Sequence, residues 1–163
     1  FGAMDLAKTN DLNNHKFLKK LGPEPLGNNF NSDYLRSKLS KKESPIKNVL
    51  LDQSVVSGLG NIYVCEALFM SGISPKKKAF KISKDKCEEL VQNIRIILNA
   101  AIQAGGSSLK DFTDIQGNSG YFQFEFYVYG RENNWCKTRD CGHKIQRIPQ
   151  SGRSSFYCPS CQR

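Results

Sequence analysis

Four cysteines in the last part of the chain constrain its folding more than any other feature. Cys136 and Cys141 enclose four residues, sixteen residues follow, and Cys158 and Cys161 then enclose two. Two close cysteine pairs at the ends of a short β-rich stretch are typical of a structural zinc ribbon, because Zn²⁺ takes four thiolates tetrahedrally. A stretch this short cannot bury a core of its own, so the metal must supply its folding energy. The sequence therefore predicts one structural zinc ion held by these four residues.

The same cysteines also allow two alternatives to a zinc site. The four could form two disulfides or be unrelated thiols, and the first pair has a looser spacing than the second. His143 follows the first pair closely, but four cysteines already complete a zinc site, so we expect it to be an ordinary ribbon residue. Cys65 and Cys87 lie in helical patterns and are predicted to be core thiols.

The charge of the chain restricts the class of partner. Its 24 Lys and Arg residues exceed its 15 Asp and Glu residues, giving a formal net charge of +9, which a four-thiolate zinc site lowers by about two. Such a charge favours DNA, RNA or an anionic membrane surface. A membrane partner is not expected, because no long apolar run or amphipathic Arg-rich leader is present. The start, Phe1-Gly-Ala-Met, favours a fragment of a longer intracellular protein.

Apolar periodicity predicts a mainly α chain with a small β ribbon. Residues 1–30 are rich in Gly, Pro and Asn, and we expect a linker with little structure of its own. Residues 31–104 are predicted to be helical. Helix starts are expected at Ser32, at Ser44-Pro45, after Asn61 and at Ser83. The apolar residues of the longest helix are predicted to be mostly core: Leu90, Val91, Ile94, Ile97, Leu98, Ala101 and Ile102.

The period changes after Gly105. Residues 106–120 are predicted to form a loop, and the alternation from Tyr121 to Tyr129 predicts a strand. Two shorter strands, 143–148 and 154–157, should form a hairpin with Arg153 at its tip.

A glycine-rich turn, Gly58-Leu59-Gly60-Asn61, separates two predicted helices. Free backbone N–H groups at a helix start, with no side chains blocking approach, suit a phosphate group. The Asn61 amide and Arg153 would add to the same anion site. The alternatives are a plain structural turn and a solvated arginine, but the basic charge of the chain favours phosphate binding.

In a series of motifs, the chain resembles the formamidopyrimidine-DNA glycosylases, also called Fpg or MutM. These motifs occur in the same order as in the family, at residues 50–75, 105–112, 120–122, 128–132 and 152–162. The resemblance implies a helix-two-turns-helix DNA-binding domain over residues 31–120, including a lesion-recognition loop at 105–122. A four-cysteine zinc-finger hairpin over 121–163 would follow it, and residues 1–30 would be the tail of an N-terminal domain and a linker. The DNA-binding residues that it implies are Phe1, Lys47, Gly60, Asn61, Tyr121 and Arg153.

The resemblance also implies an activity. Members of the family excise oxidised purines such as formamidopyrimidine and 8-oxoguanine in base-excision repair, then cleave the strand as AP lyases through an N-terminal proline followed by glutamate. This chain has no such start, so we expect no catalytic residue in it and no activity alone. The implied protein is a bacterial, cytoplasmic, nucleoid-associated monomer that binds double-stranded DNA containing damaged bases. The alternatives are a free-standing zinc-ribbon module that binds nucleic acid such as RNA, and a purely structural domain, which the charge makes unfavourable.

Overall fold

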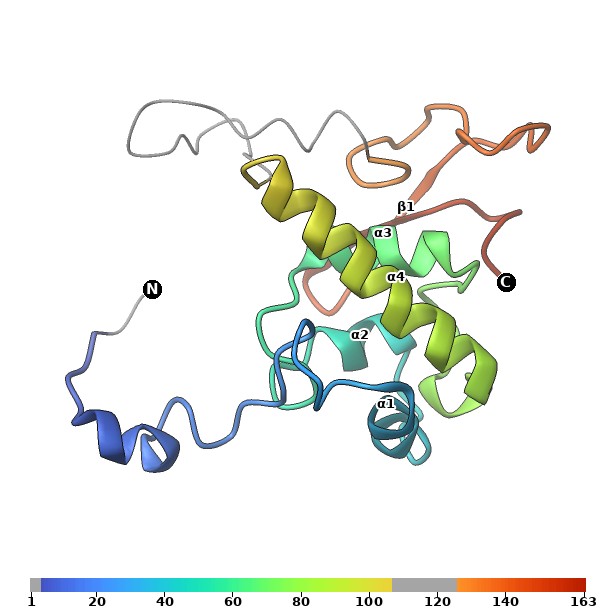
Figure 1. Cartoon of the computed structure of the whole chain (residues 1–163). Helices are drawn as coiled ribbons and strands as arrows, with labels where there is room; N and C mark the ends of the chain where they lie inside the picture. The colour runs from blue at the N-terminus through green and yellow to red at the C-terminus, as the bar shows by residue number, and fades with distance from the viewer. Residues whose placement is uncertain (1–3, 107–125) are drawn as a thin grey trace.

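The computed structural model of the protein describes residues 4–106 and 126–163. Figure 1 shows a group of helices with a β hairpin beside α3. In chain order the elements are η1 (Thr9–Asn14), α1 (Ser32–Leu39), α2 (Ile46–Leu50), α3 (Asn61–Met70), η2 (Ala79–Lys81), α4 (Lys84–Gln103), β1 (Gln146–Gln150) and β2 (Arg153–Tyr157). The predicted fold class, mainly helical with a small β ribbon, is confirmed. Within the described ranges no helix is long and apolar enough to cross a membrane.

Side-chain caps start α1 and α4, and the starts of α1 and α2 are shifted by one residue from prediction. The Asn31 side chain caps α1 by accepting from the Tyr34 N–H at 2.9 Å, so Ser32 is the first helical residue and not the cap. Pro45 takes the cap position of α2 with an extended backbone, and the helix begins at Ile46. Ser83 caps α4 as predicted, accepting from the Lys86 N–H.

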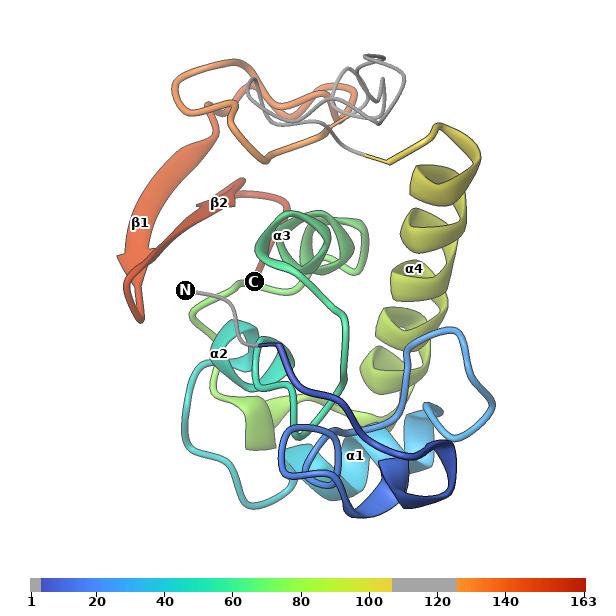
Figure 2. The ribbon, with the colours of Figure 1, turned by 90° about the vertical axis from the view of Figure 1, so that its left-hand side faces the viewer.

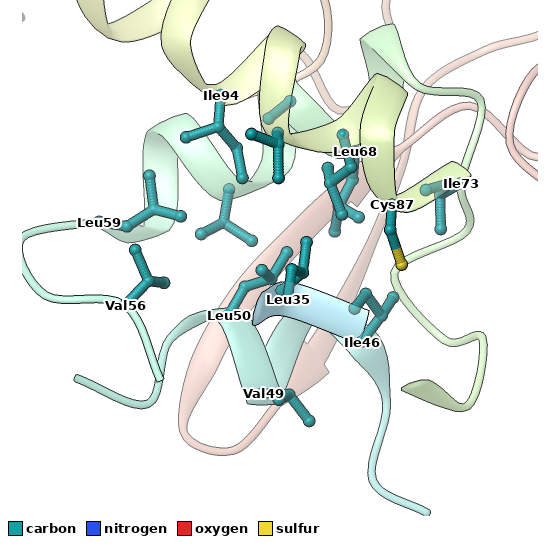
Figure 3. Packing of buried hydrophobic residues seen from close by; sticks show 14 of the residues in the cluster. Leu35, Ile46, Val49, Leu50, Val56, Leu59, Leu68, Ile73, Cys87 and Ile94 are labelled. Carbon is teal, nitrogen blue, oxygen red and sulfur yellow. The ribbon is translucent and has the colours of Figure 1, made fainter. Parts of the chain in front are cut away.

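The helices share one apolar core, part of which Figure 3 shows. α4 contributes most of its predicted apolar face, and it packs against both α1 and α3. Ile102 is an exception, because the residue is 64% exposed. A second, smaller cluster joins the ribbon to α3: its buried members are Cys65, Phe69, Val128, Ile145, Phe156 and Cys158. The two clusters have different buried residues, so the ribbon has a contact surface separate from the helical core.

Residues 22–30 pack against the helices. The Arg95 guanidinium of α4 donates to the carbonyl oxygens of Pro25, Gly27 and Phe30, at 3.3, 3.1 and 2.7 Å. Phe30 is fully buried in the helical core. This part of the expected linker is therefore ordered by the helical core. The division of the chain into domains at residues 30 and 120 remains a prediction.

Gly22 lies where the chain first meets the helical part. Its N–H donates to the Gln53 carbonyl at 2.8 Å, and a Cβ at this position would lie 2.6 Å from the backbone carbonyl carbon and oxygen of Val55. Backbone atoms cannot move aside as a flexible side chain can. We expect Gly22→Ala to lower the free energy of unfolding by about 1–3 kcal/mol, as measured by denaturant unfolding.

Gly27 provides the matched control for this substitution. Its added Cβ would come no closer than 3.4 Å to another atom, the Glu24 carbonyl oxygen. Gly27→Ala should therefore change stability by less than Gly22→Ala, and equal effects would show that close approach is not the reason for glycine at position 22.

The ribbon is a two-stranded antiparallel hairpin in which Gln150 pairs with Arg153. Ser151 and Gly152 connect the strands with φ values of 47° and 73°, as a tight turn that follows the twist of the strands requires. The predicted strand 121–129 is wrong for its described part, because Phe126–Tyr129 form no strand. The N–H groups of the last three of these residues bind the Glu66 carboxylate instead. The rest of that prediction, and most of the predicted loop, lie outside the described residues.

Candidate metal centre and nucleic-acid interface

The four predicted metal ligands meet at one point. Their Sγ atoms all lie within 4.8 Å of one another, and Cys141 Sγ is 3.6 Å from Cys158 Sγ and 3.4 Å from Cys161 Sγ. Thiolates bound tetrahedrally at 2.3 Å from zinc would be about 3.8 Å apart, whereas a disulfide needs about 2.05 Å. The residues fit one structural zinc ion and not the two disulfides considered as an alternative.

The wide spacing of the first cysteine pair is accommodated by a turn. The Thr138 N–H and hydroxyl lie 3.5 and 3.4 Å from Cys136 Sγ, and Asp140 takes a left-handed backbone conformation with φ of 59°. The Cys136 N–H donates to the His143 carbonyl at 2.8 Å. His143 itself contacts the Cys141 carbonyl oxygen through Nδ1, at 2.7 Å. Four residues between the cysteines therefore still allow both sulfur atoms to reach one ion.

The glycine-rich turn lies open at the start of α3. Gly58 has φ of 79°, which favours glycine, and its N–H donates to Gln53 Oε1 at 2.8 Å. Gly60 is the N-cap of α3 and has an ordinary φ of −97°, with no side-chain cap. A Cβ at Gly60 would meet no atom within 4 Å. No described atom occupies the space beside Gly60, so a ligand can approach its backbone from outside.

Two side chains from this region converge on one backbone atom of the hairpin. Lys47 Nζ and Asn61 Nδ2 each lie 3.1 Å from the Ser154 carbonyl oxygen and donate to it. Lys47 comes from α2, Asn61 from the start of α3, and Ser154 from β2, next to Arg153. We name these three residues the turn–hairpin junction. It fixes the glycine turn and the arginine of the hairpin relative to each other.

Lys47 and Asn61, which the resemblance implies as DNA-binding residues, both form a contact within the protein, and their role in DNA binding stays a prediction. Lys47 is fully buried, and burial lowers the pKa of its ammonium group, which the positive charge of Arg153 lowers further. Asn61 uses its amide nitrogen on Ser154, and its Oδ1 is buried without a hydrogen-bond partner among the described residues. Arg153 is exposed at the start of β2. In this arrangement Arg153 can reach an external anion, while Lys47 is placed to support the hairpin.

A buried carboxylate replaces the expected strand pairing of residues 127–129. Glu66 Oε2 accepts from the Tyr127 N–H at 2.8 Å, and Oε1 accepts from Val128 and Tyr129 at 3.0 and 2.7 Å. Glu66 has no exposed surface. Burial raises the pKa of this carboxyl group, and the three N–H donors oppose that increase. One side chain of α3 thus fixes the segment that leads into the ribbon.

Sequence reasoning missed Glu66 and the burial of Lys47. Glu66 is the single charged residue in Asn61–Met70, a helix otherwise rich in apolar residues. A lone carboxylate in such a helix was the available signal, because a buried charge needs several hydrogen-bond partners. Phe1 and Tyr121, the remaining predicted DNA contacts, lie outside the described residues.

Two family patterns match the chain. The pattern described as "Formamidopyrimidine-DNA glycosylase H2TH domain" matches residues 21–113, and "Zinc finger found in FPG and IleRS" matches residues 139–163. The second match includes Cys141, Cys158 and Cys161 and begins after Cys136. Both matches agree with the observed order of a helical part followed by a four-cysteine ribbon.

Similar proteins cover the whole length of the chain. It is 56% identical over 163 residues to a formamidopyrimidine-DNA glycosylase of Dinoroseobacter shibae and 57% identical to one of Jannaschia sp., spanning 57% and 58% of their lengths. The structure resembles the crystal structure of MutM (Fpg) from Thermus thermophilus, with a TM-score of 0.86 at 36% identity, over 93% of this chain and 57% of that one. It also resembles MutM in complex with DNA containing carbocyclic 8-oxo-G, with a TM-score of 0.84 at 39% identity, over 95% of this chain and 55% of that one. The chain thus spans slightly more than half the length of the relatives it matches.

Proposed function

Because this chain belongs to the formamidopyrimidine-DNA glycosylase family, we propose that it binds double-stranded DNA containing damaged bases. It does so as the DNA-binding part of a bifunctional DNA glycosylase and AP lyase that excises oxidised purines in base-excision repair. The protein acts on the bacterial chromosome as a monomer. Similar structures were solved with DNA containing Fapy-dG and carbocyclic 8-oxo-G, which supports this substrate class.

The turn–hairpin junction is the observation that carries this proposal. It brings an unblocked helix start at Gly60 and an exposed arginine, Arg153, onto one rigid surface, although they lie about ninety residues apart in the sequence. Backbone N–H groups and arginine are both preferred phosphate donors. Together they suit two phosphates of one DNA backbone. A free-standing zinc ribbon that binds RNA would not account for the family match over residues 21–113.

The polypeptide of residues 1–163 should bind DNA without doing chemistry on it. The family's nucleophile is the secondary amine of an N-terminal proline, and the nearest prolines here, Pro23 and Pro25, are internal residues whose nitrogens are amides. Their carbonyl oxygens accept from the Ser57 N–H and from Arg95. We expect no base release, no strand cleavage and no covalent adduct on borohydride treatment with DNA that contains an abasic site. A trapped adduct on this polypeptide would contradict the proposal.

Arg153→Ala tests the phosphate contact directly. We expect weaker duplex binding by a similar factor for every DNA sequence, and a salt slope of log affinity smaller by roughly one unit. The residue lies exposed at the turn, so the melting temperature should change little. A stability collapse with unchanged affinity per folded molecule would show instead that Arg153 is a structural residue of the ribbon.

Lys47→Met is the companion variant, because it distinguishes a residue that positions the hairpin from one that contacts phosphate. Lys47 is buried, so its loss should weaken binding by releasing the hairpin while leaving the salt slope close to that of the unmodified chain. Asn61→Ala should behave in the same way, since the amide carries no charge. If Lys47→Met lowers the salt slope as much as Arg153→Ala does, Lys47 contacts phosphate itself.

A further inference from the structure

An exposed aromatic surface lies at the zinc-binding end of the ribbon, away from the turn–hairpin junction. We name Tyr127, Trp135, Lys137 and Lys144 the aromatic knuckle. Trp135 is 63% exposed and Tyr127 42% exposed. In Figure 2 the segment 126–145 lies at the end of β1 opposite the β1–β2 turn, where Arg153 is found. The phosphate site of the proposed function does not include these residues.

The backbone that carries the two aromatic residues is fixed. The Arg131 guanidinium donates to the Tyr127 carbonyl at 2.5 Å and to the Trp135 carbonyl at 2.9 Å, so one side chain joins both. Trp135 also forms an isolated antiparallel bridge with Lys144. The zinc ligand Cys136 follows directly in the chain. An aromatic ring held rigidly in solvent loses little conformational entropy when it binds a partner.

Each exposed ring has a lysine above it. Lys144 Nζ lies 5.1 Å from the Trp135 ring centre, and Lys137 Nζ lies 5.7 Å from that of Tyr127. Among the described residues neither lysine forms an ion pair with a carboxylate.

The nearby acidic side chains have other partners. Glu132 is 3.6 Å from Arg147, and Asp140 is 3.5 Å from Arg139. Lys137 is close enough to the buried Glu66 carboxyl group to lower its pKa, so Lys144 is the knuckle lysine that is available to an external anion.

We propose that the aromatic knuckle is a second nucleic-acid contact, which binds single-stranded DNA by stacking an unpaired base on Trp135. A nucleotide offers a flat π face and a phosphate a few ångströms away, and the knuckle offers a ring and a lysine at matching separation. An acidic peptide could satisfy the lysines but would leave the indole face without a stacking partner. The net positive charge of the chain also favours binding of a polyanion such as DNA.

The fluorescence of Trp135 gives a direct test, because it is the single tryptophan of the chain. Addition of a single-stranded oligothymidylate to the zinc-loaded protein should quench this fluorescence. Trp135→Ala should weaken binding of the labelled oligonucleotide, measured by anisotropy, about tenfold. Trp135→Tyr should retain most of the affinity. Lys144→Ala should lower the salt slope by roughly one unit.

The controls separate this site from the phosphate site. Arg153→Ala should leave quenching by the oligothymidylate intact even where duplex binding is weakened, and Lys41→Ala, at an exposed lysine after α1, should not alter quenching. Zinc content verifies that each variant retains its ribbon. The proposal is overturned if the oligonucleotide binds without changing the fluorescence, or if Trp135→Ala binds it as tightly as the unmodified chain. It is also overturned if a polyglutamate peptide changes the fluorescence and the oligonucleotide does not, because the knuckle would then be a protein-binding surface.

Discussion

Cys158→Ser should unfold the ribbon while the helices stay folded, and bound zinc should fall from about one ion per chain to nearly none. Structural zinc in small domains contributes on the order of 10–16 kcal/mol of apparent binding free energy. The ribbon has no comparable source of stability, since its buried cluster is small and partly made of the ligands themselves. Elemental analysis measures the metal, and amide hydrogen exchange locates the unfolded residues.

The helices should survive because their core is made of different residues. None of the four ligands belongs to the helical cluster. Cys87→Ala is the matched control, because Cys87 is a buried thiol in α4 that does not approach the metal site. It should leave one zinc ion per chain. A fully ordered ribbon without zinc, in Cys158→Ser or after treatment with a chelator, would contradict the metal assignment.

Glu66→Ala should have the second large effect, a loss of at least about 3 kcal/mol in the free energy of unfolding. The substitution leaves the N–H groups of Tyr127, Val128 and Tyr129 without their acceptor. A buried donor without a partner costs more than the hydrogen bond itself contributed. Thermal unfolding would report a melting temperature lower by about 6–12 °C. Hydrogen exchange should show lost protection at these three amides.

Two variants define what the carboxylate contributes. Glu66→Gln keeps one acceptor oxygen, so its effect should be intermediate. Glu89→Ala removes a carboxylate that is 43% exposed and paired with Lys86 at 2.6 Å on α4. That change should cost less than about 1 kcal/mol, as exposed ion pairs do. A Glu66→Ala protein as stable as Glu89→Ala would show that residues 127–129 find other acceptors.

Local sequence patterns predicted the elements whose stability is local. The spacing of the cysteines predicted the metal site, and the apolar repeat from Leu90 with the Ser83 cap predicted α4. The cap of α1 is Asn31 and not the predicted Ser32. The sequence alone could not distinguish them, because both residues can cap a helix and only the backbone geometry decides.

Contacts between distant residues could not be predicted in this way. Phe126–Tyr129 alternates like a strand, yet Glu66, about sixty residues earlier, binds its N–H groups. Lys47 resembles a surface lysine in the sequence, and only the position of Ser154 explains why it is buried. The positions of such long-range acceptors follow no period along the chain. The sequence signal for Glu66 was its isolated charge in an apolar helix.

The distance in sequence between Lys47 and Ser154 has a consequence for how the protein is made. Most of the helical core comes from residues up to Ala101, with Phe126 as its last member, and it could form early during synthesis, whereas the turn–hairpin junction needs Ser154, which is translated later. Closing a loop of this length is entropically costly and contributes to slow folding. A nascent chain stalled before Ser154 would therefore contain folded helices but would not yet hold the arginine of the hairpin against the glycine turn. On the proposed function, DNA binding would therefore be acquired late, after the ribbon has been synthesised and has taken up its metal.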